Sequence, residues 1–175
     1  MSASGTQDFR LGFLTAVEDA ERGYVGGLLV TNRFGRPLEF QCTAPVKPNK
    51  TQQILYGPTL RPYVLAELIG RTLVEKASVK PSLIITESAD LLDLRIHVAC
   101  PVASLANAKS SLDSSLPSLR LGEQTIVFAA DRADDRDSVQ AQAKQIPSDA
   151  DLKEPFDRVR EALQETLRTT MSRAG

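Results

Sequence analysis

The sequence has few of the residues that build metal sites or disulfide frameworks. It contains one histidine, two cysteines and no tryptophan in 175 residues. A structural zinc site takes four ligands, and these residues are too few to supply them. A Ser-His-Asp triad would need a nucleophile-elbow motif, which is absent. We therefore expect no metal site of this kind and no cofactor, and the cysteine count favours a reducing compartment, the cytoplasm.

The only histidine lies close to a cysteine. His97 and Cys100 have an H-x-x-C spacing on what we expect to be a strand, and Cys42 is the second cysteine. Residues three apart on a strand face opposite sides, so the spacing does not converge on a metal. We predict that Cys100 is a small buried thiol rather than a nucleophile.

Other absences exclude whole classes of protein. The net charge of −1 argues against a nucleic-acid coat or a general membrane binder. No apolar run approaches the roughly 20 residues that span a bilayer, and the first residues lack the apolar core of a signal peptide. There is no phosphate-binding or dinucleotide-binding glycine pattern and no internal repeat. These features predict an ordinary globular protein of the cytoplasm.

The clearest pattern lies between Leu38 and Ser88, where we expect a strand, a basic loop, a helix and a second strand. Leu38, Phe40 and Cys42 alternate with polar residues, as in a strand with one buried face. Pro45 then ends this strand, because proline has no backbone N–H to donate.

A helix is expected after Thr59, a suitable N-cap, with Pro62 in its first turn. The Leu-Ile-Ile run in 82–86 lacks alternation, which suits a central strand covered on both faces. A strand, a crossover helix and a strand usually form a right-handed parallel unit. We therefore predict that the strands of Phe40 and Ile84 pair in parallel.

The remaining segments predict a mixed α/β sheet. The first 45 residues read as an antiparallel meander of three strands, and Gly26-Gly27 indicates a bulge or a close approach of another segment. The expected later elements are a short helix over 89–95 and strands over 96–102 and 125–129. The fold class is thus α/β, with a meander followed by parallel crossover strands and a C-terminal amphipathic helix.

The length suits one domain with added segments. The expected division is a disordered tail over 1–8, an α/β domain over 9–130, a charged linker over 131–151 and a C-terminal helix over 152–172. Apolar residues in that helix recur every three or four positions. The helix has three possible roles: it docks on its own domain, pairs with a second copy, or lies in the groove of a partner.

The order of elements resembles that of ribonuclease-H-like folds over residues 11–105. It is similar to endonuclease V in having a strand like 82–87 that is followed later by one like Cys100-Pro101-Val102. The segment CTAPVKPNKTQQILYGPTL is also similar to bacterial proteins to which no activity is assigned.

The resemblance to ribonuclease-H-like folds implies a two-metal nuclease. Such enzymes hold two divalent ions with carboxylates from the middle of the first strand, the first crossover helix and the end of the fourth strand. In this sequence the candidates are Glu18, Glu67 and Glu87, with Asp90 nearby. The first strand, 11–17, contains no acid, so the expected central carboxylate is missing.

The basic loop supplies a different candidate site. Lys47, Lys50 and Arg61 surround the expected start of the main helix, whose free N–H groups favour anions. Tyr56 and Tyr63 flank this site and are candidates to stack on a base, with a place in the core as the equal alternative for Tyr63. A phosphate-containing ligand, a nucleic-acid backbone or an acidic protein partner fits this chemistry.

Three hypotheses follow for function. The leading one is a non-catalytic binding or adaptor module that recognises an anionic or protein partner through the basic loop, and this protein would not be an enzyme. The first alternative is a metal-dependent nuclease or phosphodiesterase of ribonuclease-H-like type, intact or degenerate. The second alternative is a homodimeric structural protein that pairs through its C-terminal helix.

Overall fold

A computed structural model describes residues 8–107 and 115–173 of the chain. Of the tail expected over 1–8, only Asp8 lies inside the described residues. Within them, no helix is long and apolar enough to cross a membrane.

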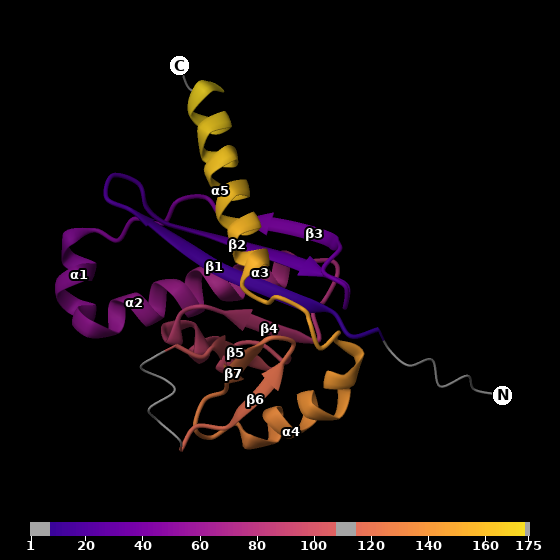
Figure 1. Cartoon of the computed structure of the whole chain (residues 1–175). Helices are drawn as coiled ribbons and strands as arrows, with labels where there is room; N and C mark the ends of the chain where they lie inside the picture. The colour runs from indigo at the N-terminus through magenta and orange to yellow at the C-terminus, as the bar shows by residue number, and fades with distance from the viewer. Residues whose placement is uncertain (1–7, 108–114, 174–175) are drawn as a thin grey trace.

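The described strands form one mixed seven-stranded sheet in the order β3-β2-β1-β4-β5-β7-β6 (Figure 1). β1 pairs with β2 in antiparallel fashion and with β4 in parallel, and β4 also pairs with β5 in parallel. This arrangement confirms the predicted meander followed by parallel crossover strands. The strands are β1 Leu11–Asp19, β2 Gly23–Thr31, β3 Pro37–Cys42, β4 Leu83–Thr86, β5 Val102–Leu105, β6 Ser118–Leu121 and β7 Gln124–Val127.

The predicted parallel pairing of the Phe40 and Ile84 strands is wrong. β4 lies beside β1, with Leu14 opposite Thr86, and β3 lies at the edge of the sheet. The reason is burial: most of β1 and all of β4 are buried, whereas no residue of β3 is. A strand that is apolar on both faces stabilises the sheet most when it is central.

Two helical layers cover the sheet, and the alternation of side chains divides the core between them. On one face, Phe13 and Ile85 pack with α4 and α5. On the other face, Leu14 and Ile84 pack with the helices between β3 and β5. We call these the α5 face and the η2 face.

The chain from Lys50 to Lys76 is helical almost throughout, so the expected basic loop is itself largely helix. Its parts are α1 Lys50–Tyr56, η1 Gly57–Thr59, α2 Leu60–Pro62, the π-helix η2 Tyr63–Gly70 and α3 Arg71–Lys76. The helix begins after Asn49, whose side chain forms a capping box with Gln52. Thr59 is not an N-cap, because its hydroxyl donates to the carbonyl of Tyr56 inside the helical run.

The second half of the chain differs from expectation in two places. The 3₁₀-helix η3 covers Ala89–Ile96, but β5 begins only at Val102, so His97 and Cys100 lie in the turn before it. The segment 131–151, expected as a charged linker, contains α4 Ala133–Gln142 and η5 Ala143–Gln145. Val139 and Ile146 anchor this segment in the core, where they are almost fully buried.

The C-terminal helix α5, Glu154–Arg173, docks on the sheet of its own chain (Figure 1). Its residues Phe156, Val159 and Leu163 are buried, and the ring of Phe156 meets that of Phe13 edge-on at 5.5 Å. This contact supports the first of the three roles considered above. The part of the apolar stripe formed by these three residues is thus covered by the chain's own sheet, and among the described residues nothing supports pairing through it with a second copy or a partner.

The Gly26-Gly27 pair marks a close approach, as predicted. A Cβ on Gly26 would lie 2.0 Å from Cγ2 of Ile69, and one on Gly27 would lie 2.8 Å from Cγ1 of Val159. The two glycines therefore let one helical layer on each face come close to β2.

Candidate functional site

The parallel strands β1 and β4 end at the same edge of the sheet, which is where open α/β sheets bind their ligands. Acidic and basic side chains from several elements gather there. We call this group the carboxyl edge; it consists of Glu18 at the end of β1, Glu87 after β4, Asp90 on η3, Arg61 on α2 and Arg160 on α5.

On the η2 face, Arg61 joins the two acids Glu18 and Asp90. Its Nε donates to Oδ2 of Asp90 at 2.9 Å, and its Nη1 donates to Oε2 of Glu18 at 3.2 Å. Burial opposes the charge on Arg61, but the hydrogen bond and charge of Asp90 and the charge of Glu18 outweigh it, so the pKa of Arg61 is raised. The arginine is therefore a permanent counter-ion to both carboxylates.

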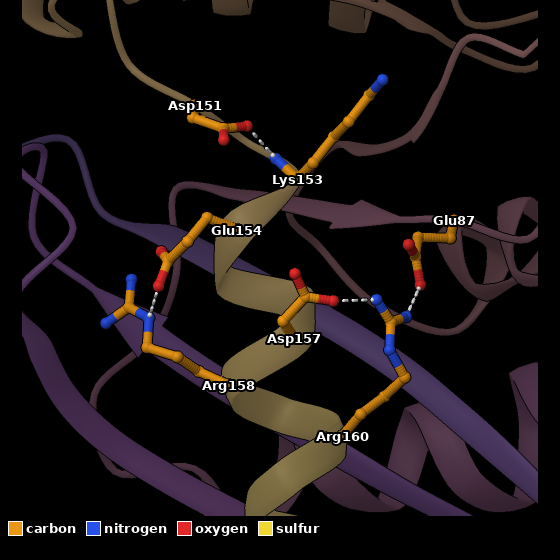
Figure 2. Close-up of polar contacts among 7 residues, drawn as sticks. All are labelled: Glu87, Asp151, Lys153, Glu154, Asp157, Arg158 and Arg160. Atoms are coloured by element: carbon orange, nitrogen blue, oxygen red, sulfur yellow. Dashed lines mark hydrogen bonds and ion pairs between the residues drawn. The ribbon is translucent and has the colours of Figure 1, made fainter.

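On the α5 face, Arg160 holds the acid that follows β4 (Figure 2). Its Nη1 pairs with Glu87, and its Nη2 pairs with Oδ1 of Asp157 at 2.6 Å. The hydrogen bond to Asp157 and the charge of Glu87 raise the pKa of Arg160 against the effect of partial burial. The sequence analysis missed Arg160 and Asp157, because only the docking of α5 brings them to the end of β4.

The acids of the carboxyl edge thus lie on two opposite faces of the sheet. Side chains alternate along a strand, so Glu18 shares the η2 face with Leu14, and Glu87 shares the α5 face with Ile85. The prediction that Glu18 and Glu87 lie together in one site is therefore not supported. Glu18 and Asp90 do come together, through Arg61.

The resemblance to ribonuclease-H-like nucleases implies metal-binding carboxylates in the middle of the first strand and at the end of the fourth, and the structure shows which residues occupy these two positions. The middle of β1 is Thr15 and the last residue of β4 is Thr86, both buried and neither ionisable. The third candidate, Glu67, lies on η2 between Tyr63 and Arg71. Among the described residues there is no group of three or more His, Cys, Asp or Glu side chains that could hold a metal ion. As placed, the donor set does not fit two metals, and we derive no step through them.

The arginine contact carries a testable prediction, because Arg61 occupies the space between Glu18 and Asp90. We expect Arg61→Gln to cost less than about 1 kcal/mol, since the pair is half exposed. With the guanidinium gone, the two carboxylates repel each other and attract divalent cations, so added Mn²⁺ should stabilise the variant more than the wild type.

Thermal unfolding with and without Mn²⁺ measures this difference. The matched control is Arg71→Gln, because Arg71 is equally exposed at 49% and pairs with a single acid, Glu75. An Mn²⁺ response that is the same in the wild type and in both variants would show that Arg61 does not exclude cations.

The basic residues do not form the predicted rim at a helix start. The Nζ of Lys47 donates to the carbonyl of Glu21 at 2.8 Å, Lys50 is an exposed residue at the start of α1, and Arg61 is paired with acids. Because the helical run begins at Lys50, directly after the N-cap Asn49, the main helix has no separate free N-terminus near Arg61.

An aromatic and apolar surface lies on the same helical run. The rings of Tyr56 and Tyr63 stack with centroids 4.6 Å apart and an interplanar angle of 17°. On α1, Ile54 and Leu55 are 68% and 77% exposed, which is unusual for large apolar side chains. The apolar run Ile54-Leu55-Tyr56 is visible in the sequence, but the lysines and the arginine around it favoured the prediction of an anion-binding loop.

The thiol near the only histidine is not activated. Burial raises the pKa of Cys100 to about 11, so the thiol is protonated at neutral pH. Cys100 is half-buried, and as a protonated thiol it offers no nucleophile.

Comparison with known proteins finds similarity in structure alone. No protein-family model and no curated protein sequence matches the chain. Endonuclease V of Ciona intestinalis matches with a TM-score of 0.52 and 10% identity, over 93% of this chain and 89% of that one. Its D234N variant matches with a TM-score of 0.51 and 10% identity, over 93% and 88%. Both of those proteins are in complex with DNA that contains an inosine followed by a ribo-adenosine.

These neighbours are nucleases, which contradicts the leading hypothesis of a non-catalytic adaptor and the expectation that the protein is not an enzyme. At 10% identity the likeness establishes the architecture, and it confirms the resemblance inferred from the order of elements. The chain has an endonuclease-V-like fold.

Proposed function

We propose that the protein is a nuclease of ribonuclease-H-like type that acts on phosphodiester bonds of nucleic acid at the carboxyl edge. The observation that carries the proposal is the match to two DNA-bound endonuclease V structures over about nine-tenths of each chain. The ends of β1 and β4 carry Glu18 with Asp90 on one face of the sheet and Glu87 on the other, and the acids of either face could accept and donate protons at this edge.

The surface beside Arg61 suits a nucleic acid more than a small anion. The stacked pair Tyr56 and Tyr63 presents aromatic faces, and Ile54 and Leu55 add exposed apolar area. Stacking of a base on an aromatic side chain contributes about 1–3 kcal/mol whatever the base. This matters because the net charge of −1 provides little general attraction to a polyanion.

Strand cleavage of labelled oligonucleotides tests the proposal. The substrate is DNA with an inosine followed by a ribo-adenosine, the control is the same strand with neither, and each is incubated with Mg²⁺, with Mn²⁺ and with EDTA. We expect the wild-type chain to cleave, and we expect Glu18→Gln or Glu87→Gln to lower the rate about 100-fold, depending on which face of the sheet reacts.

The control variant is Glu75→Gln, an exposed acid that pairs with Arg71 on α3, outside the carboxyl edge. Its rate should equal that of the wild type. No cleavage under any of the three conditions would refute the nuclease proposal, and full cleavage by both edge variants would refute the location.

A further inference from the structure

A second candidate site lies at the opposite edge of the sheet, before the parallel strands begin. It is a cavity of about 810 Å³, which is within the usual size range of small-molecule sites. Its walls are the residues that precede β1, β4 and β5, the end of α3 and one side of α4. The cavity shares no residue with the carboxyl edge.

The walls of this cavity are held by hydrogen bonds of their own. Arg95 and Asp135 form an ion pair of 2.8 Å with both side chains mostly buried, and Nη1 of Arg95 donates to the carbonyl of Val98. The backbone N–H of Arg10 donates to Oγ of Ser82, whose own N–H donates to the carbonyl of Arg10. Because these hydrogen bonds already fix the cavity walls, ligand binding would lose little free energy to the ordering of the walls.

Basic and apolar residues together line this cavity. Arg10, Lys80 and His97 line it, and within the described residues the guanidinium of Arg10 makes no hydrogen bond or ion pair. Lys80 is anchored, since its Nζ donates to the carbonyl of Val74 at 2.7 Å. A free guanidinium is the side chain best suited to bind a carboxylate or phosphate with two parallel hydrogen bonds.

The remaining lining sets the shape of the ligand. Phe9 and Val139 belong to the core behind the cavity, whereas the half-buried Val98 and Pro101 supply apolar surface. The acids Asp8 and Glu75 also line the cavity and limit its excess of positive charge. The thiol of Cys100 also lines the cavity, but its pKa of about 11 keeps it protonated. The chemistry is therefore that of binding, with no covalent step.

We propose that this cavity binds a small organic anion, in which a carboxylate or phosphate meets Arg10 and an apolar ring lies against Val98 and Pro101. The proposal does not depend on nuclease activity, because the cavity and the carboxyl edge lie at opposite ends of β1.

His97 is the only histidine of the chain, so its imidazole signal in a ¹H–¹³C spectrum needs no assignment and reports directly on this cavity. The probes are phenyl phosphate and benzoate, with inorganic phosphate lacking the ring and phenol lacking the charge. We expect phenyl phosphate or benzoate to shift the His97 signal at lower concentration than either control compound. The comparison between them distinguishes a phosphate from a carboxylate ligand.

Variants test the role assigned to the guanidinium. Arg10→Gln should weaken binding of the best probe at least about tenfold, and Arg10→Lys should weaken it less, because the charge remains while the fork is lost. Arg36→Gln, in the turn between β2 and β3, should bind as the wild type does. The proposal is overturned if no probe shifts His97, or if Arg10→Gln binds with unchanged affinity while its backbone spectrum shows an intact fold.

Discussion

Replacing Phe156 by alanine should lower the free energy of unfolding by about 3–5 kcal/mol. The side chain is fully buried and its ring contacts that of Phe13 edge-on at an interplanar angle of 87°. Truncation would remove this contact and leave a cavity between α5 and β1 that the surrounding sheet is too rigid to fill. Urea unfolding followed by circular dichroism measures the change.

The control is Gln164→Ala on the solvent side of the same helix, which should change stability by no more than about 0.5 kcal/mol. If Phe156→Ala cost under about 1 kcal/mol, α5 would not be part of the core. The effect also bears on the carboxyl edge, because Arg160 lies one turn further along α5 and depends on the same docking to reach Glu87.

The second large effect is expected at Gly23, where β2 begins. Its φ is +91°, and a Cβ there would lie 2.2 Å from the carbonyl oxygen of Val46. That carbonyl accepts a hydrogen bond from the N–H of Tyr24, and the N–H of Val46 donates back to Tyr24. Gly23→Ala therefore adds backbone strain and a collision with main-chain atoms, and we expect it to cost about 2–4 kcal/mol.

Gly57 provides a matched comparison. Its φ is +52°, but among the described residues no atom beyond its chain neighbours lies within 4 Å of the place that a Cβ would take. Gly57→Ala therefore carries the strain of a positive φ without the collision, and it should cost about 1–2 kcal/mol. Equal losses in the two variants, measured by urea unfolding, would mean that the contact between Gly23 and Val46 contributes nothing.

The sequence predicted most of the local structure correctly where burial and period agreed. Strand alternation and the apolar run in 82–86 indicated the strands, and the spacing of three and four residues indicated α5. The capping box of Asn49 and Gln52 was present as well but was missed, because the prolines and lysines around it favoured a loop. The helix α4 was missed because its single deeply buried apolar residue, Val139, is too little for a periodic signal.

The candidate site was harder to predict than the fold. The acids at the ends of β1 and β4 are visible in the sequence, since a strand end is a local feature. Their partners are not, because Arg61 and Glu18 are 43 residues apart and Arg160 and Glu87 are 73 apart. Contacts of that separation depend on how the layers pack, which no local pattern encodes.

What the sequence by itself determined is most of the strands, the helical segment before β4, the helix α5 with its apolar stripe, and the order of these elements, since propensity and hydrophobic period act over a few residues. Only the tertiary structure decided that β4 pairs with β1 instead of β3, and that the acids of the carboxyl edge divide between two faces, each with its own arginine. The physical reason is common to both. Which strand becomes central is set by burial of both its faces at once, and that choice fixes which side of the sheet each later side chain meets.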